Sequence, residues 1–295
     1  MRGRGVRRAW SDDRSYAGFL KRLIIRPGAI GDFIVSIPAM ECLRAGYLEV
    51  WAAPRNVALA ARIAQHARSI ASTGLDMLEL TGPNAGLLET LRGFDSIVSW
   101  YGANRPEFRE AVAALRLPFQ FFAALPPEGR GTHAADFYLE QVRLIAPCAS
   151  DGIPHIACDA IRGGSAVIHP FAGNPKKRWP MERFQELARA LARRIPVEWC
   201  AGPEDELPGA RRFEDLFELA CWLATARIYI GNDSGPTHLA AAVGTPVVAL
   251  FGPSDPAVWA PRGPHVAIAA APALGSITVE QVANLVQNML ENSRP

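Results

Sequence analysis

The stretch IYIGNDSGPTHLAAA, residues 228–242, decides how this chain folds. Its first three residues are β-branched or aromatic and predict a buried strand, and the Ala-rich run that begins at Thr237 predicts a helix. A polar, glycine-containing turn lies between them, and Pro236 falls in the first helical turn, where proline is well tolerated. A strand, a tight turn and a helix in this order are typical of a βαβ unit and hence of a parallel sheet.

The same alternation extends outward over nearly the whole chain. Strands are expected at residues 22–25, 47–52, 96–100, 118–122, 166–169, 197–200, 228–230, 247–251 and 266–269. Helices are expected at residues 33–44, 54–66, 107–115, 134–145, 181–194, 213–226, 237–243 and 279–290. The pattern pauses at residues 146–164, which are rich in Pro, Gly, Asp and Ser, and then restarts. We therefore predict an α/β protein with two Rossmann-like domains at 21–150 and 160–295, whose parallel sheets face each other across a cleft.

Composition excludes several classes of protein. A net charge of +2 is too small to indicate nucleic-acid binding, and no apolar run is long enough to span a bilayer. Residues 1–20 are predicted to be a basic, disordered leader; they lack the apolar segment of a signal peptide and would also suit contact with an anionic membrane surface. The five cysteines form no CxxC pair, so we expect neither a zinc site nor a disulfide framework, in keeping with a reducing, cytoplasmic location.

Three loops follow predicted strands and carry candidate site residues. In RPGAIGD (26–32), Gly28 and Gly31 allow a tight turn and Asp32 begins a helix, where a carboxylate also serves as a simple cap. In HPFAGNPKKRWP (169–180), three adjacent cations suit a diphosphate but equally suit a solvated loop. In the turn 231–238, the free amides of a helix N-terminus favour an anion, with Asp233 or Ser234 as the expected cap. A fourth loop, AGPEDE (201–206), offers Glu204 either to a ribose or to solvent.

Together and in this order, these segments resemble glycosyltransferase family 9, the ADP-heptose:lipopolysaccharide heptosyltransferases. The matching blocks are RPGAIGDFIVSIPAM (26–40), HPFAGNPKKRWPMERF (169–184), AGPEDE (201–206) and GNDSGPTHLAAAVGTPVVALFGPSDP (231–256). The resemblance implies a GT-B fold, with an amino-terminal acceptor domain and a carboxyl-terminal nucleotide-sugar domain. It also implies that the final helix crosses back to brace the first domain.

The resemblance further implies roles for individual residues. Asp32 would be the general base and Lys177 the phosphate-contacting lysine of an inverting transfer, with Arg178 as its neighbour and Gly28 and Gly31 giving close backbone approach. Glu204 would lie near the ribose or base, and the remaining contacts to the diphosphate and donor sugar would come from Asp233, Ser234, Gly235, Thr237 and His238. No metal or other cofactor is expected, since the one DxD-like run, at residues 12–14, lies in the leader.

As partners, the resemblance implies a nucleotide sugar such as ADP-heptose and a glycan or glycolipid acceptor of the lipopolysaccharide core. Contact with the cytoplasmic face of the inner membrane would suit such an acceptor. The middle of the first domain, residues 69–103, carries no recognisable acceptor signature. Two alternatives stay open: a sugar-nucleotide epimerase of GT-B type and a non-catalytic sugar-nucleotide-binding paralogue. A dehydrogenase is disfavoured, because GxxG lacks the third glycine of the dinucleotide fingerprint.

Overall fold

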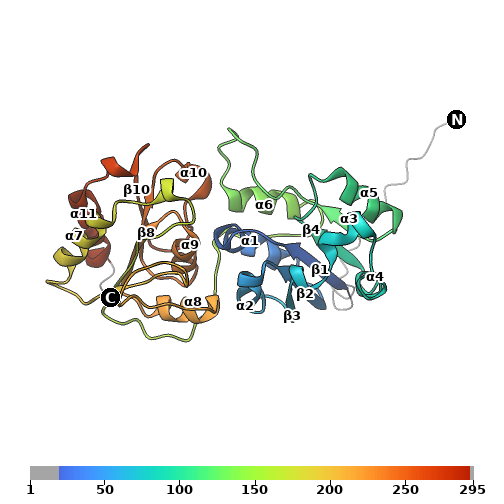
Figure 1. Ribbon diagram of the computed structural model, residues 1–295, viewed down its shortest axis with the longest axis horizontal. Coiled ribbons are helices and arrows are strands. Elements are labelled where there is room, and N and C mark those ends of the chain that lie inside the picture. Colours follow the sequence, from blue (N-terminus) through green and yellow to red (C-terminus); the bar gives the residue numbers. More distant parts are fainter. Residues whose placement is uncertain (1–19, 293–295) are drawn as a thin grey trace.

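The computed structural model describes residues 20–292, which form two lobes that each contain one parallel five-stranded sheet (Figure 1). The predicted fold class, two Rossmann-like α/β units, is therefore confirmed. The first sheet has the order β3-β2-β1-β4-β5, with β1 Lys21–Arg26, β2 Tyr47–Ala52, β3 His66–Ser69, β4 Ser96–Ser99 and β5 Phe119–Phe121. The second has the order β10-β9-β8-β6-β7, with β6 Ala166–His169, β7 Val197–Trp199, β8 Ile228–Asn232, β9 Val247–Phe251 and β10 Val266–Ala270. The predicted leader at residues 1–20 falls almost wholly outside the described residues.

Several of the helices that cover these sheets present one apolar stripe to them. In α7, residues Met181–Leu191, the side chains of Phe184, Leu187 and Leu191 are buried at helical spacing while Glu182 and Arg189 face away. The other helices of at least eight residues are α1 Ile30–Cys42, α4 Ala85–Arg92, α5 Pro106–Ala114, α6 Ala134–Val142, α8 Leu216–Ala224, α9 Gly235–Ala242 and α11 Val279–Asn292. The short ones are α2 Val57–Ala60, α3 Leu78–Thr81 and α10 Pro256–Trp259.

Two predictions about helices are wrong. The helix expected over residues 54–66 is only a 3-10 turn, Pro54–Asn56, followed by α2, because His66–Ser69 pairs with β2 as an edge strand. The final helix, over the residues that the structure describes, packs within its own lobe and does not brace the first domain. Instead α11 packs on α7 and on the second sheet, where Val282 and Val286 share a hydrophobic cluster with Trp179.

The two lobes meet where α1 packs against α9, and a single hydrophobic cluster runs through both (Figure 1). The Ala-rich sequence of α9 makes this close approach possible, because alanine side chains are small and let the two helix axes lie close together. A second contact between the lobes comes from α6. Asp136 forms a bidentate ion pair with Arg262, at 2.8 and 2.5 Å. His133, just before α6, contacts the carbonyl oxygen of Ala260 at 2.9 Å. These contacts join the two lobes at a second place besides the packing of α1 on α9.

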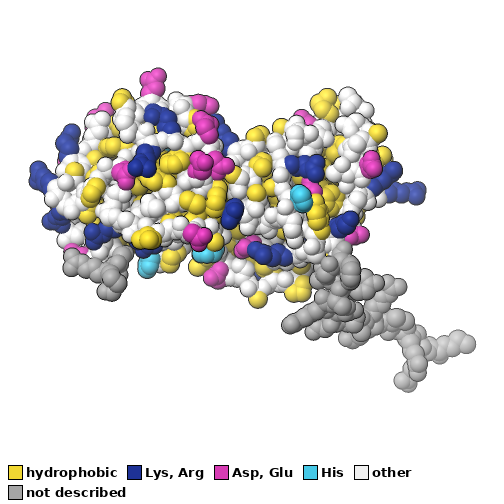
Figure 2. Space-filling view, turned by 90° about the horizontal axis from the view of Figure 1, so that it is seen from below, with side chains coloured by type: hydrophobic (Ala, Val, Ile, Leu, Met, Phe, Trp, Pro, Cys, Tyr) yellow, Lys and Arg dark blue, Asp and Glu magenta, His cyan; other side chains and the backbone are white. Residues whose placement is uncertain are grey.

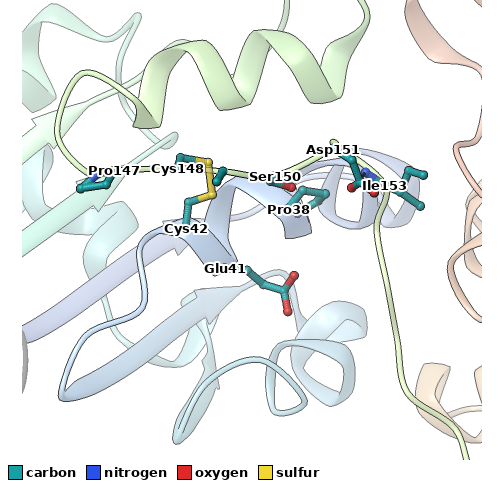
Figure 3. Close-up of a pocket in the computed structure, with 9 residues that line it drawn as sticks. Pro38, Glu41, Cys42, Pro147, Cys148, Ser150, Asp151 and Ile153 are labelled. Carbon is teal, nitrogen blue, oxygen red and sulfur yellow. Dashed lines mark hydrogen bonds between the residues drawn. A yellow bond between two sulfur atoms is a disulfide. The ribbon is translucent and has the colours of Figure 1, made fainter.

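The cysteines contradict the expectation of no disulfide. Cys42, at the end of α1, is bonded to Cys148 in the segment that joins the two lobes, and Figure 3 shows this bond in the wall of a pocket of about 660 Å³. Further along the same segment, the sulfur of Cys158 lies 3.3 Å from that of Cys221 in α8. Only Cys200 is fully buried as a small apolar residue, and burial raises the pKa of its thiol to about 12. Cysteine usage therefore gives no support for a reducing compartment.

Neither charge dominates the face of the molecule seen in Figure 2. Acidic and basic side chains are interspersed there over both lobes. Among residues 20–292, no helix combines the length and the apolar character needed to cross a bilayer.

Candidate functional site

The first half of the site is the turn between β1 and α1. Gly28 has a φ of +143°, a backbone conformation that other residues rarely adopt, and its carbonyl accepts a hydrogen bond from Asn56 Nδ2 at 3.1 Å. This turn places Asp32 in the first turn of α1, with its side chain partly buried. The carboxylate thus lies at the positive end of a helix and at the carboxyl edge of the sheet.

The ionisation of Asp32 depends on opposing influences. Burial raises the pKa of its carboxyl group above the ordinary value, while the Arg26 guanidinium, the Ala29 amide and the Lys177 ammonium lower it. The Asp233 carboxylate raises it further. Lys177 and Asp233 come from the second half of the chain, so residues of both halves act on this carboxylate.

The second half of the site is the turn between β8 and α9. Asp233 is 7% exposed and accepts an ion-paired hydrogen bond from Lys177 Nζ at 2.7 Å. His238 lies 3.9 Å from the other carboxylate oxygen of Asp233, and burial lowers the pKa of its imidazole to about 4, so the ring is neutral near pH 7. Lys177 and His238 therefore lie beside the two oxygens of one carboxylate, next to the amino-terminal end of α9.

The prediction that Asp233 or Ser234 caps α9 is wrong. The carboxylate of Asp233 is engaged by Lys177, and the hydroxyl of Ser234 pairs with that of Thr237 at 3.2 Å rather than with a backbone amide. Thr237 in turn donates to the carbonyl oxygen of Asn232. The end of α9 is therefore left without a side-chain cap, which suits an external acceptor of hydrogen bonds.

The basic loop reaches this turn through its backbone. The side chain of Asn232 accepts a hydrogen bond from the Trp179 amide at 2.9 Å and donates one to the carbonyl of Pro170 at 2.8 Å. These two bonds hold the loop against the turn and direct Lys177 toward Asp233. Arg178 is exposed and donates through Nε to the Ala172 carbonyl at 2.7 Å, so it faces its own loop.

Glu204 stands apart from this cluster. Its side chain is 88% exposed, and its one ion pair among residues 20–292 is with Arg55 of the first lobe, at 3.3 Å. The pair crosses the boundary between the lobes, but exposed ion pairs of this kind contribute little to stability. The structure does not bring Glu204 into contact with Lys177 or Asp233.

The two turns touch each other directly. A Cβ atom added to Gly31 would lie 3.1 Å from His238 Cδ2, and one added to Gly235 would lie 2.6 Å from Ile30 Cβ. Only glycine fits at Gly235, since real Cβ atoms do not approach within 3.0 Å. Asp32, Lys177, Asp233 and His238 therefore belong to one site at the junction of the lobes.

Sequence reasoning missed two residues of this site, Arg26 and Asn232. Asn232 is the last residue of β8 and fully buried, and a polar side chain at the end of a buried strand was a usable signal. Within residues 20–292, no group of three or more His, Cys, Asp or Glu side chains is arranged to hold a metal ion.

Two parallel-sheet domains whose strand–helix turns meet at one junction define the GT-B class of glycosyltransferase folds. Residues 149–285 match the family model of glycosyltransferase family 9 (heptosyltransferase).

Curated relatives match over part of their length. Lipopolysaccharide heptosyltransferase 3 of Escherichia coli (strain K12) is 36% identical over 115 residues, which cover 32% of this chain and 33% of that protein. Across the curated relatives the matches span between 33% and 48% of their length. They therefore characterise a part of this chain and not the whole.

Solved structures extend the likeness of fold to almost the whole chain. The family 9 glycosyltransferase of Veillonella parvula DSM 2008 has a TM-score of 0.76 at 18% identity, covering 94% of this chain and 99% of that one. The E. coli ADP-heptose LPS heptosyltransferase II has a TM-score of 0.69 at 19% identity, covering 92% and 99%.

Proposed function

We propose that this protein is an inverting, metal-independent glycosyltransferase that moves a sugar from a nucleoside diphosphate to a glycan acceptor. The donor we propose is ADP-heptose, and the acceptor is a glycan of the lipopolysaccharide core. One observation carries the proposal: the carboxylate of Asp32 and the ion pair of Lys177 with Asp233, from different domains, share one site.

The second lobe suits the donor. The uncapped end of α9 and the ammonium of Lys177 together offer amides and positive charge to a diphosphate. The family match falls on this lobe, and a structural neighbour is named for ADP-heptose. Bound diphosphate oxygens would take over Lys177 from Asp233, and the exposed Arg178 side chain would be free to swing toward the same charge.

The proposed step uses Asp32 as the base. The acceptor hydroxyl oxygen attacks the anomeric carbon, the bond from that carbon to the diphosphate oxygen breaks, and its electron pair leaves with the nucleoside diphosphate. The hydroxyl proton passes to Asp32, whose carboxylate must be ionised beforehand. Lys177 and the α9 amides stabilise the charge that grows on the leaving group, and they replace the metal that other transferases use.

We place the acceptor on the first lobe, because Asp32 belongs to it. Exposed Arg55 lies at the junction beside the Gly28 turn and suits the acidic groups of a core glycan. Contact of the chain with a membrane at its cytoplasmic face is part of the same proposal, since lipopolysaccharide acceptors are lipid-anchored. Glu204, next to Arg55, is proposed to turn toward the donor ribose when the ion pair opens.

The donor side can be tested by thermal shift with ADP, UDP and GDP in the presence of excess EDTA. A ligand present at 100 times its Kd stabilises the folded state by about 2.7 kcal/mol. ADP should raise the Tm by several degrees and UDP and GDP should not. The same EDTA-treated protein should transfer heptose from ADP-heptose to a heptose-deficient core glycan. Dependence on added magnesium would contradict the metal-independent mechanism.

The same assay separates the alternatives. An epimerase would convert the nucleotide sugar without any acceptor, and a non-catalytic binding protein would show the ADP shift without turnover. An acceptor-dependent release of ADP excludes both. Failure of all three nucleotides to shift the Tm would overturn the proposal itself.

A further inference from the structure

Arg26 is a buried cation with no carboxylate partner. It ends strand β1, six positions before Asp32, and its side chain is 2% exposed. No ion pair joins it to an acidic side chain within residues 20–292. Burying a charge in this way is costly unless hydrogen bonds or a nearby opposite charge compensate it.

Each bond that the guanidinium makes goes to a neutral oxygen. Nε donates to Ser36 Oγ at 3.1 Å, and the terminal nitrogens donate to the carbonyls of Ala124 at 3.2 Å and Asp32 at 3.0 Å. Two of these three acceptors belong to α1. The guanidinium therefore fastens the first turns of α1, including the backbone of Asp32, to the end of β1.

Aromatic faces hold the rest of the guanidinium. Its carbon lies 4.6 Å from the centre of the Tyr138 ring and 5.7 Å from that of Trp100. Such cation–π contacts stabilise a desolvated cation without neutralising it. The positive charge of Arg26 therefore remains available to act on Asp32, and among the groups that lower the pKa of Asp32 it has the largest effect.

Arg26 differs from Lys177 in one important respect. Lys177 belongs to the second lobe, so its distance from Asp32 changes whenever the lobes move. Arg26 belongs to the same strand–turn–helix unit as Asp32 and moves with it. Its field acts on the carboxylate in every arrangement of the lobes.

We infer that Arg26 is a positioning residue for Asp32: it fastens the first turn of α1 to the end of β1 and keeps a positive charge beside that turn before the acceptor arrives. The inference rests on the proposed role of Asp32 as the base. It assigns a role to the positive charge of Arg26, in addition to the volume that its side chain occupies in the core.

The experiment is a pH titration of the Asp32 carboxyl carbon by 13C NMR, assigned with Asp32→Asn. Arg26→Met removes the charge but keeps most of the volume, and should raise the titration midpoint by on the order of one pH unit. Arg26→Lys keeps the charge and should restore most of the difference. If Arg26→Met does not fold, Arg26→Gln serves the same purpose.

Arg22 provides the matched control. It lies on the same strand, is also buried, and donates to the Leu43 carbonyl at 2.9 Å, but it is about 13 Å further from the turn. Arg22→Met should leave the Asp32 midpoint unchanged. An unchanged midpoint in folded Arg26→Met or Arg26→Gln, or an equal rise in Arg22→Met, would overturn the inference.

Activity adds a second and separate readout. Loss of the positive charge favours the protonated carboxyl, so the acidic limb of the kcat/KM profile should move to higher pH by the same amount as the NMR midpoint. If the wild-type protein transfers no sugar, the proposed function fails, while the NMR titration still decides whether Arg26 controls Asp32. A shifted midpoint with an unshifted pH profile would remove Arg26 from the reaction.

Discussion

Gly235→Ala tests the contact between the two turns. Gly235 begins α9, and an added Cβ atom would lie 2.6 Å from Ile30 Cβ and 2.8 Å from its Cγ2. Neither atom is the far end of a flexible side chain, so α1 and α9 must separate or bend. Overpacking of this kind typically costs about 1–3 kcal/mol. If the turns were not in contact, the same change would stabilise the protein, because alanine favours a helix over glycine by up to about 1 kcal/mol.

The sign of the change in the free energy of unfolding therefore decides whether the two turns are in contact. Urea unfolding should show that Gly235→Ala lowers the free energy of unfolding by about 1–3 kcal/mol, and transfer activity should fall with it. Gly173→Ala is the control: Gly173 is exposed and an added Cβ meets nothing within 4 Å, so its effect should stay within about 0.5 kcal/mol. Replacing Ile30 by Gly in the Gly235→Ala background should recover part of the loss. A Gly235→Ala variant as stable as wild type, or more so, would refute the packing of the two turns.

Two further predictions concern stability. The Cys42–Cys148 bond joins positions 106 residues apart, so Cys42→Ser should lower the free energy of unfolding by about 2–4 kcal/mol under non-reducing conditions. Thiol titration of the denatured, unreduced protein should find three thiols, and finding all five would contradict the bond. Burial lowers the pKa of both His169 and His238 to about 4, so the unfolded state binds more protons than the folded state below pH 6.5. The free energy of unfolding should therefore fall as the pH is lowered from 6.5 to about 4, by up to roughly 3 kcal/mol for each histidine. Glutamine at either position should flatten this dependence, and a slope equal to that of the wild-type protein in both variants would refute the assignment.

The strands were the most predictable part of the fold. Residues 47–52, 166–169 and 247–251 form strands with the predicted bounds, because each is a short apolar run closed by polar or turn-forming residues. The edge strand His66–Ser69 was missed, since its sequence HARS has no apolar run and its pairing with β2 alone makes it a strand. Helix α4, residues Ala85–Arg92, was missed as well, although the side chain of Asn84 caps it by accepting from the Leu87 amide.

The site was predictable as a set of loops but not as a set of contacts. The carboxyl ends of parallel strands bring their loops to one edge of a sheet, so the loops that carry Asp32, Lys177 and Asp233 could be chosen from the sequence. Residue spacing in the sequence does not predict side-chain contacts. The ion pair of Lys177 with Asp233 and the positioning role inferred for Arg26 could therefore not be predicted. Cys42 and Cys148 are too far apart in the chain for their bond to be visible in the sequence.

Two variants, Asp32→Asn and Lys177→Met, test most directly whether the first lobe supplies the base and the second lobe binds the diphosphate. Each is compared with the wild-type protein for ADP affinity by calorimetry and for turnover with donor and acceptor. Asp32→Asn should reduce kcat by about 10²–10⁴-fold while its Kd for ADP stays within about 3-fold, under ~0.7 kcal/mol. Lys177→Met should weaken ADP binding and slow turnover together. Full turnover by Asp32→Asn, or ADP binding that depends on Asp32 and not on Lys177, would contradict the assignment of the base to the first lobe and of the diphosphate to the second.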